Sequence, residues 1–255
     1  MGIMEILNSI LLDSKKIEVS KLPSQGFFYK KDFTLKIKKA EVEDIIEYEF
    51  NFDTDDLIKS IECIKKIVKK NVILDNGYKY EDIKSVDIIF IFLEIVKFTN
   101  NADINIEYID SLGQEGIIKF DTANFNYFNF EPYKSGYDEE NREINIKGYR
   151  FSLPSIGVET CLTRFLSSKS TVSEVKKLSK VNYDFMFFLG GKSFLSFDEI
   201  ENLIEIFNSD LDESEIEKVR SIVNTFKDIV GYTLLADGRT IEIKTKINLK
   251  EIWKI

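Results

Sequence analysis

The spacing of apolar residues changes in the same order twice along this chain of 255 residues. A stretch with period two, typical of strands, gives way to stretches with period 3.6, typical of helices, and two further alternating runs follow. This order runs from Phe33 to Phe125 and again from Tyr149 to Leu249. A chain that mixes the two periods in this way is expected to fold as an α+β protein.

Two alignments within the sequence indicate an internal duplication. Writing FTLKIKKAEVEDII above YRFSLPSIGVETCL pairs Val42 with Val158 and Glu43 with Glu159. Writing YIDSLGQEGIIKFDTANF above YTLLADGRTIEIKTKINL needs no gap. We predict two related modules, each a β-hairpin or strand pair, a helical segment and a terminal β-ribbon. The alternative is chance similarity, because the identities are few.

The predicted boundaries follow from this order. They are an N-terminal helical arm at residues 1–21, a first module at 22–131, a linker at 132–141 and a second module at 142–255. Five apolar residues of the arm share one helical face: Ile3, Ile6, Leu7, Ile10 and Leu11. This face is expected either to dock on a partner or to pack on its own domain.

The balance of charge argues against two classes of partner. The formal net charge is -9 at pH 7, whereas nucleic acids and anionic lipids recruit clustered Lys and Arg. The densest basic group, the lysines between residues 65 and 70, has the spacing of the solvated side of an amphipathic helix. The longest apolar run, VDIIFIFLEIVKF, is too short to span a bilayer. We expect partners other than nucleic acid or membrane, and the sequence leaves the oligomeric state open.

Residues that commonly carry catalysis are scarce. The chain contains no histidine, which is the commonest general base and zinc ligand. Its two cysteines, Cys63 and Cys161, fall on apolar faces of predicted helices and are expected to be core residues. FLGGKS lacks the first glycine of a phosphate-binding loop, because Met186 takes that position, and its glycines are expected to end a helix. We expect no catalytic residue, no cofactor and no metal.

The stretch LPSQGFFYKK, from Leu22 to Lys31, is the most distinctive local motif. Apolar and polar residues alternate on both sides of it, so it is predicted to join the two strands of a hairpin. Pro23 presets the turn, and Gly26 allows a positive φ. A second LPS stretch begins at Leu153, but it lies out of register with the duplication and is interpreted as coincidental.

This motif resembles that of a known family. LPSQGFFY, from Leu22 to Tyr29, is similar to the LPSxGxxY hairpin near the start of baseplate hub proteins of T-even-type contractile-tailed bacteriophages. The order of strands, helices and ribbons is also similar across residues 20–255, down to an aromatic after the last ribbon, here Trp253. Many relatives carry cysteine pairs in the ribbon that suggest zinc. Neither ribbon here contains a cysteine, so no metal is carried over.

The resemblance implies a non-enzymatic role in building a phage baseplate or tail, as an assembly factor or as an incorporated subunit. Its partners would be other tail or baseplate proteins, in the host cytoplasm during assembly or in the baseplate of the virion. The candidate partner-binding residues lie in the first hairpin and near the C-terminus: Leu22, Pro23, Gly26, Phe27, Phe28, Tyr29, Trp253 and Ile255. The alternative for these residues is that they cover the module cores.

Two other functions are compatible with the sequence. One is a carboxylate- and metal-dependent enzyme that lacks histidine, which would need several acidic side chains in one concave pocket. The other is a general scaffold or adaptor protein. Genomic neighbourhood would separate the adaptor from the phage protein, because tail genes cluster.

Overall fold

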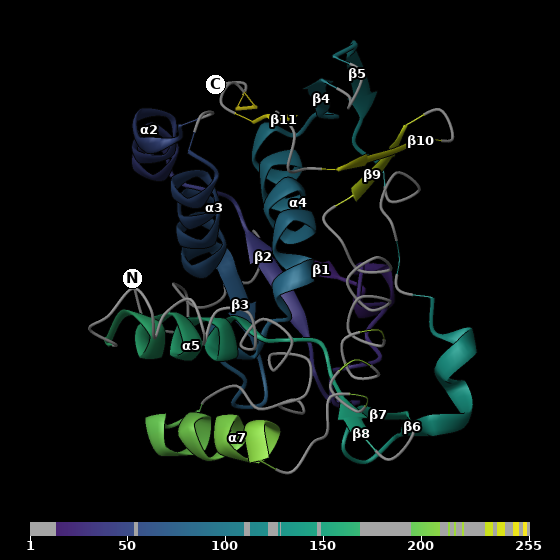
Figure 1. Ribbon diagram of the computed structural model, residues 1–255. Coiled ribbons are helices and arrows are strands. Elements are labelled where there is room, and N and C mark those ends of the chain that lie inside the picture. Colours follow the sequence, from purple (N-terminus) through teal and green to yellow (C-terminus); the bar gives the residue numbers. More distant parts are fainter. Residues whose placement is uncertain are drawn as a thin grey trace, which may run out of the picture.

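The protein combines helices with small antiparallel sheets, so the α+β class predicted from the sequence is confirmed (Figure 1). The computed structural model describes residues 14–53, 56–109, 113–121, 127, 129–146, 149–168, 195–209, 214, 217, 221, 233–236, 239–242, 247–249 and 252–253. The predicted end of a helix at FLGGKS lies outside these residues, as do residues 1–13 of the predicted arm.

The first sheet contains β1 (Ser14–Ile17), β2 (Leu35–Lys38) and β3 (Val72–Leu74), in that order and antiparallel. Leu35 and Ile37 of β2 are fully buried, and the lysines between and after them lie on the other face. The pairing of β1 with β2 is the predicted hairpin. Because residues 14–17 form a strand and η1 (Val19–Lys21) is a 3-10 turn, this part of the chain does not belong to a helical arm.

Three helices of the first half form where the periodicity predicts them: α2 (Val42–Asn51), α3 (Leu57–Asn71) and α4 (Ile88–Asn100). Helix α4 is apolar on nearly all sides, and its residues 88–96 are all buried. It packs against both α3 and β2 and so lies at the centre of this half (Figure 1). Asn101 ends α4 in the left-handed conformation, a common helix stop.

Short turns lead from β3 to α4. Asn76 and Gly77 both have positive φ, at 60° and 79°, as an Asn-Gly turn requires. Two 3-10 turns follow, η2 (Tyr80–Asp82) and η3 (Ser85–Asp87).

The first ribbon is formed by β4 (Asn105–Ile109) and β5 (Glu115–Lys119). Ile106 and Ile118 are directly paired and both buried. After β5, Phe120 meets Phe90 of α4 edge to face, with ring centroids 5.8 Å apart. An isolated two-stranded ribbon is marginally stable, so this packing on α4 contributes to the stability of the ribbon.

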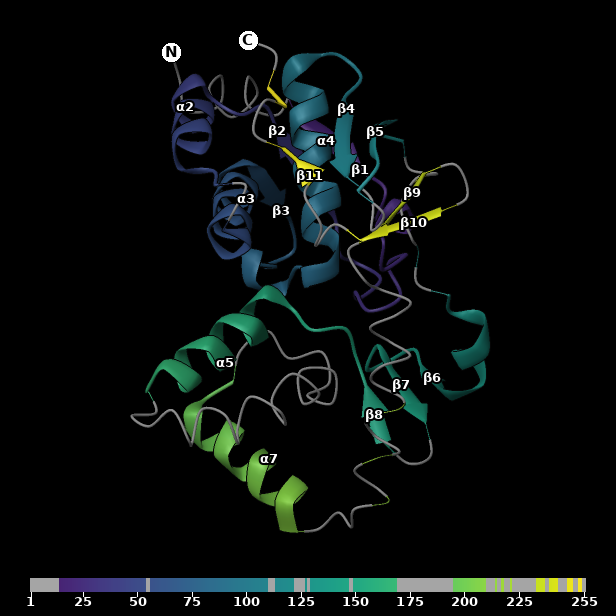
Figure 2. The ribbon, with the colours of Figure 1, turned by 45° about the horizontal axis from the view of Figure 1, so that its top comes forward.

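The second half contains a small sheet, two helices and another ribbon. The sheet is β6 (Tyr137–Asp138), β7 (Glu143–Ile146) and β8 (Tyr149–Phe151), preceded by η5 (Glu131–Gly136). Helices α5 (Ile156–Ser168) and α7 (Phe197–Ser209) lie side by side below the first-half helices in Figures 1 and 2. Strands β9 (Thr233–Ala236) and β10 (Arg239–Glu242) form the ribbon. Residues 132–141, predicted as a linker, form most of η5 and all of β6.

The C-terminal segment returns to the first half. Strand β11 (Ile247–Asn248) pairs antiparallel with β4, so it extends the first ribbon to three strands. Leu249, Ile252 and Trp253 belong to the same buried cluster as the first-half core. This segment, assigned by sequence to the second module, therefore completes the packing of the first.

Candidate functional site

The LPSQGFFY stretch forms a series of tight turns between β1 and β2. The Gln25 N–H donates a hydrogen bond to the Leu22 carbonyl over 2.7 Å, which closes a turn with Pro23 at its first central position. Gly26 has a φ of 78°, and a Cβ there would lie 2.9 Å from Val19 Cγ1. Both residues therefore have the turn roles predicted for them.

A buried carboxylate holds this loop in place. The Ser24 N–H and hydroxyl donate to Asp87 Oδ1 and Oδ2 over 2.9 and 2.7 Å. The Tyr29 hydroxyl donates to Asp87 Oδ2 over 2.7 Å and accepts the Lys84 N–H over 2.8 Å. All four residues are buried. Asp87 stands at the N-terminus of α4, where the helix dipole favours a negative charge.

Burial dominates the protonation equilibria of this group. It raises the pKa of Asp87 to about 6, although the hydrogen bonds from Tyr29 and Ser24 oppose the shift. It lowers the pKa of Lys84 to about 8, against the attraction of Asp87. It also raises the pKa of Tyr29 well above its usual value. The described groups that contact the Asp87 carboxylate donate hydrogen bonds to it from within the fold. Asp87 therefore has a structural role: it holds the loop against the start of α4.

Both LPS stretches of the sequence hold the same segment, residues 83–87. The second stretch does so through backbone hydrogen bonds: Ser85 N–H donates to the Pro154 carbonyl over 3.0 Å, and Ile156 N–H to the Ile83 carbonyl over 2.9 Å. The two stretches are out of register in the duplication, yet they converge on one segment. Each of the two LPS stretches thus makes hydrogen bonds to residues 83–87.

The structure places most sequence-predicted partner-binding residues in the interior. Leu22, Pro23, Phe28, Tyr29 and Trp253 are buried, Gly26 and Phe27 are half-buried, and Ile255 lies outside the described residues. Phe27 stacks on Phe130 with ring centroids 3.9 Å apart, and its carbonyl accepts a hydrogen bond from the Tyr137 hydroxyl. These aromatics contact the chain's own core, and Phe27 keeps part of its surface exposed. Their role as partner-facing anchors stays a prediction.

Trp253 packs between helices of the first half. Its ring meets Tyr48 of α2 and Phe92 of α4 edge to face, at centroid distances of 6.0 and 5.9 Å. The Tyr48 hydroxyl donates to the Leu249 carbonyl over 3.0 Å, and Asn100 Nδ2 donates to the Ile252 carbonyl over 3.1 Å. An aromatic at this end of the sequence thus serves the core.

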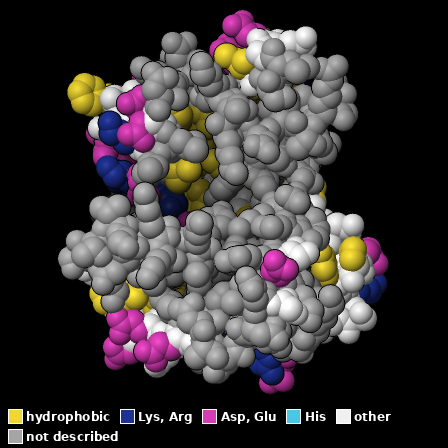
Figure 3. All heavy atoms as spheres, viewed as in Figure 1, with side chains coloured by type: hydrophobic (Ala, Val, Ile, Leu, Met, Phe, Trp, Pro, Cys, Tyr) yellow, Lys and Arg dark blue, Asp and Glu magenta, His cyan; other side chains and the backbone are white. Residues whose placement is uncertain are grey.

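Helix α2 presents three large apolar side chains to solvent. Val42, Ile46 and Phe50 are 55%, 60% and 88% exposed, and their spacing of four residues puts them on one face. The opposite face of α2 buries Ile45 and Tyr48. We call residues 42, 46 and 50 the α2 apolar stripe. In the space-filling view, hydrophobic and charged side chains project together where α2 lies, at the upper left (Figure 3).

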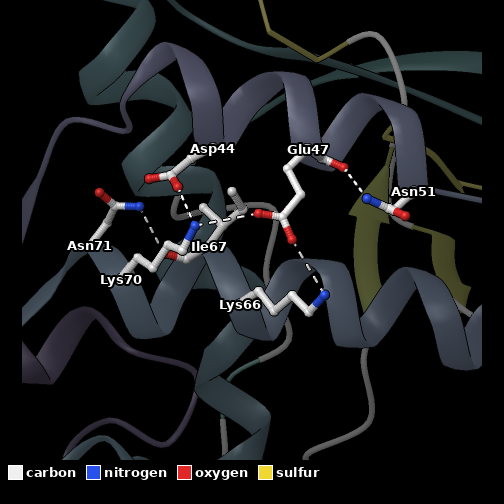
Figure 4. Close-up of polar contacts among 7 residues, drawn as sticks. All are labelled: Asp44, Glu47, Asn51, Lys66, Ile67, Lys70 and Asn71. Carbon is white, nitrogen blue, oxygen red and sulfur yellow. Dashed lines mark hydrogen bonds and ion pairs between the residues drawn. The ribbon is translucent and has the colours of Figure 1, made fainter.

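The charges of α2 are all negative, and some of them are already paired. Asp44 Oδ1 lies 2.5 Å from the Lys70 ammonium, and the Glu47 carboxylate lies 3.4 Å from both Lys66 and Lys70 (Figure 4). Within the described part of the chain, Glu43 and Glu49 have no basic partner, and both are exposed. The apolar stripe is therefore bordered by free carboxylates.

The lysines of α3 are mostly solvated, as the sequence predicts, and are also paired with acids. Beyond the contacts to α2, the Lys69 ammonium lies 3.3 Å from Glu81, and Lys65 lies 3.4 Å from Glu159 of α5. A groove of about 290 Å³ between α3, η2 and α5 is lined by these lysines and by Arg164. The charges of these lysines are therefore partly compensated by the carboxylates that they face.

Other sequence predictions concern the cysteines and the membrane. Cys63 and Cys161 are buried free thiols, which confirms them as core residues. In the ranges that the structure describes, three or more potential metal-ligating side chains nowhere converge. None of the helices in these ranges has the length and apolar character needed to cross a bilayer.

Comparisons with protein-family models, with curated proteins and with solved structures find no match to this chain. The α2 apolar stripe is a candidate contact surface that was not predicted from the sequence. A signal for it exists in the sequence, since AEVEDIIEYEF carries apolar residues on two faces of one helix, and only one face can pack on its own core.

Proposed function

We propose that the protein is a non-enzymatic component or assembly factor of a phage tail or baseplate and acts through contacts with other tail proteins. The observation that carries the contact role is the α2 apolar stripe. A continuous row of exposed apolar side chains on an ordered helix is typical of a protein-interaction surface. The phage assignment is supported by the resemblance of LPSQGFFY and of the order of elements to baseplate hub proteins.

The most exposed residue of the stripe is suited to this role. Phe50 is an aromatic on an ordered helix, and aromatics are enriched at the centres of interfaces. The stripe requires no change of fold to engage a partner, because its three members already project from the helix. Either an incorporated subunit or an assembly factor would use it in the same way.

Co-purification tests this function. The tagged chain would be expressed together with the tail and baseplate proteins encoded by neighbouring genes, and bound proteins would be identified by mass spectrometry. We expect tube, hub or wedge proteins to co-purify with the wild-type chain and to be depleted with Ile46→Ser/Phe50→Ser. Ile117→Ser, at an exposed apolar residue of β5, is the matched control. Recovery of no tail protein with the wild-type chain would refute the proposal.

A further inference from the structure

We propose that the α2 apolar stripe binds a basic amphipathic helix of a partner protein, with Lys or Arg along both edges of its apolar face. This inference rests on the proposed function, because it names the chemistry of the partner that the same surface would take. It follows from three observations: the shape of the stripe, the charges beside it, and the charge of the chain as a whole.

The shape of the stripe favours a helix as its occupant. Val42, Ile46 and Phe50 form one ridge with a spacing of four residues, and at 1.5 Å per residue this ridge is about 12 Å long. Ridges of this kind pack into the grooves between side chains of another helix. An added strand would instead need an open sheet edge with free backbone groups, whereas the exposed face of α2 offers side chains.

The charges beside the stripe specify the edges of that partner helix. At about 100° per residue, Glu43 and Glu49 each lie about 60° from Ile46 around the helix axis, on opposite sides. Both carboxylates are exposed and lack a basic partner among the described residues. A helix seated on the stripe would therefore have one carboxylate along each edge. Lysine or arginine at those edges would be complementary.

The same charges argue against a second copy of this chain as the occupant. Helix α2 carries four acidic residues and no basic one, and the whole chain has a formal charge of -9. Two stripes facing each other would bring four unpaired carboxylates together, which like-charge repulsion disfavours. A partner that carries positive charge beside apolar residues removes this repulsion.

Two synthetic helical peptides test the proposal against the full-length chain. Both carry leucines along one face; one has lysines at the two edges of that face and the other has glutamates there. Binding would be followed by fluorescence anisotropy at low and high salt. We expect the lysine peptide to bind the wild-type chain more tightly, with an affinity that falls as salt rises.

Substitutions assign the binding to the stripe. Phe50→Ser should weaken the lysine peptide by about tenfold or more, while Ile117→Ser leaves it unchanged. Glu43→Lys/Glu49→Lys should reverse the preference, so that the glutamate peptide binds more tightly. Circular dichroism would confirm that each variant keeps the wild-type helix content.

Several outcomes would overturn the inference. One is equal binding of the two peptides, or no binding of either. Another is self-association of the wild-type chain in sedimentation that Phe50→Ser abolishes, which would make a second copy the occupant. A third is peptide binding that occurs only after removal of residues 1–13, which would make the chain's own N-terminal segment the occupant.

The two experiments can fail separately. If tail proteins co-purify equally with the wild-type chain and with Ile46→Ser/Phe50→Ser, the phage function is supported and the role of the stripe is refuted. If the peptide results are as expected but no tail protein co-purifies, the preference of the stripe for a basic helix is supported and the phage function is refuted.

Discussion

The Tyr29 hydroxyl and the Asp87 carboxylate, separated by 58 residues in the sequence, are joined by a buried hydrogen bond of 2.7 Å. The same hydroxyl oxygen accepts the backbone N–H of Lys84 over 2.8 Å. One side chain thus fixes the LPSQGFFY loop to the start of α4 and also satisfies a backbone donor that water does not reach.

Tyr29→Phe should destabilise the fold by about 1–3 kcal/mol, because it removes a donor to buried Asp87 and leaves the Lys84 N–H without its acceptor. Tyr78→Phe is the matched control, since that hydroxyl bonds Asp32 at the surface over 2.6 Å. Its loss should cost about 0.5 kcal/mol or less. Urea denaturation measures both variants. Equal losses would show that the buried contact contributes no more than an exposed one.

Asp87 should make stability fall as the pH rises from about 4 to about 7. Its folded-state pKa of about 6 lies above the ordinary value of 3.8 because of burial, so the folded chain binds more protons than the unfolded chain between these values. Its favourable contribution is complete below pH 4 and lost as the pH rises through the folded pKa. Relative to Asp87→Asn, the wild-type chain should lose up to about 3 kcal/mol over this range.

Denaturation of both chains at several pH values between 4 and 7 tests this prediction. Both chains contain the same other carboxylates, so the effects of these on the pH dependence of stability largely cancel when the two are compared. Lys84, which faces Asp87, has a pKa lowered to about 8 by burial and stays charged through this window. A difference that is constant with pH would contradict the raised pKa of Asp87.

Trp253→Ala should cost about 3–5 kcal/mol of stability, because the ring fills a space between Tyr48 and Phe92. Trp253→Phe should cost much less: it keeps most of the packing, and the indole nitrogen that it removes is buried without a hydrogen-bond partner among the residues that the structure describes. Phe50→Ala, at the most exposed aromatic of α2, should change stability by about 0.5 kcal/mol or less. If Trp253→Ala is as mild as Phe50→Ala, Trp253 does not belong to the core.

Lys70→Met should lower the urea midpoint further than Lys66→Met. Lys70 is the ion-pair partner of Asp44, which is buried, at 2.5 Å, whereas Lys66 lies 3.4 Å from the more exposed Glu47. Removing Lys70 therefore leaves an uncompensated buried carboxylate, and removing Lys66 leaves a solvated one. Adding Asp44→Asn should restore part of the loss caused by Lys70→Met. Equal midpoints for the two lysine variants would contradict this difference.

Elements with strong local patterns could be predicted from the sequence. The amphipathic pattern of α3, the apolar α4, the hairpin of β1 and β2, and the turn at Asn76 and Gly77 all depend on neighbouring residues. Strand β3, with three residues, is too short for its period to be distinguished from the end of the preceding helix.

The candidate site was harder to predict from the sequence, because it depends on contacts between residues that are far apart in the chain. The pattern shows that α2 has two apolar faces, but only the packing of Ile45 and Tyr48 decides which one is covered. Trp253 is buried because β11 pairs with β4, a long-range pairing that local spacing does not predict. The sequence does contain a signal for the buried role of Asp87: an acidic residue at the start of an apolar run needs hydrogen-bond partners if the run is buried.

The contact between Tyr48 and Leu249 also has a consequence for biosynthesis, since 201 residues separate its two partners. While the ribosome is still translating the second half, the first half can form α2, α3 and α4 but lacks the segment that covers their upper end. Apolar surface around Tyr48 and Phe92 would stay open in the nascent chain until residues 249–253 emerge. Docking of Trp253 is therefore expected to be a late step of folding, and the apolar surface that it covers would be open to chaperones until then.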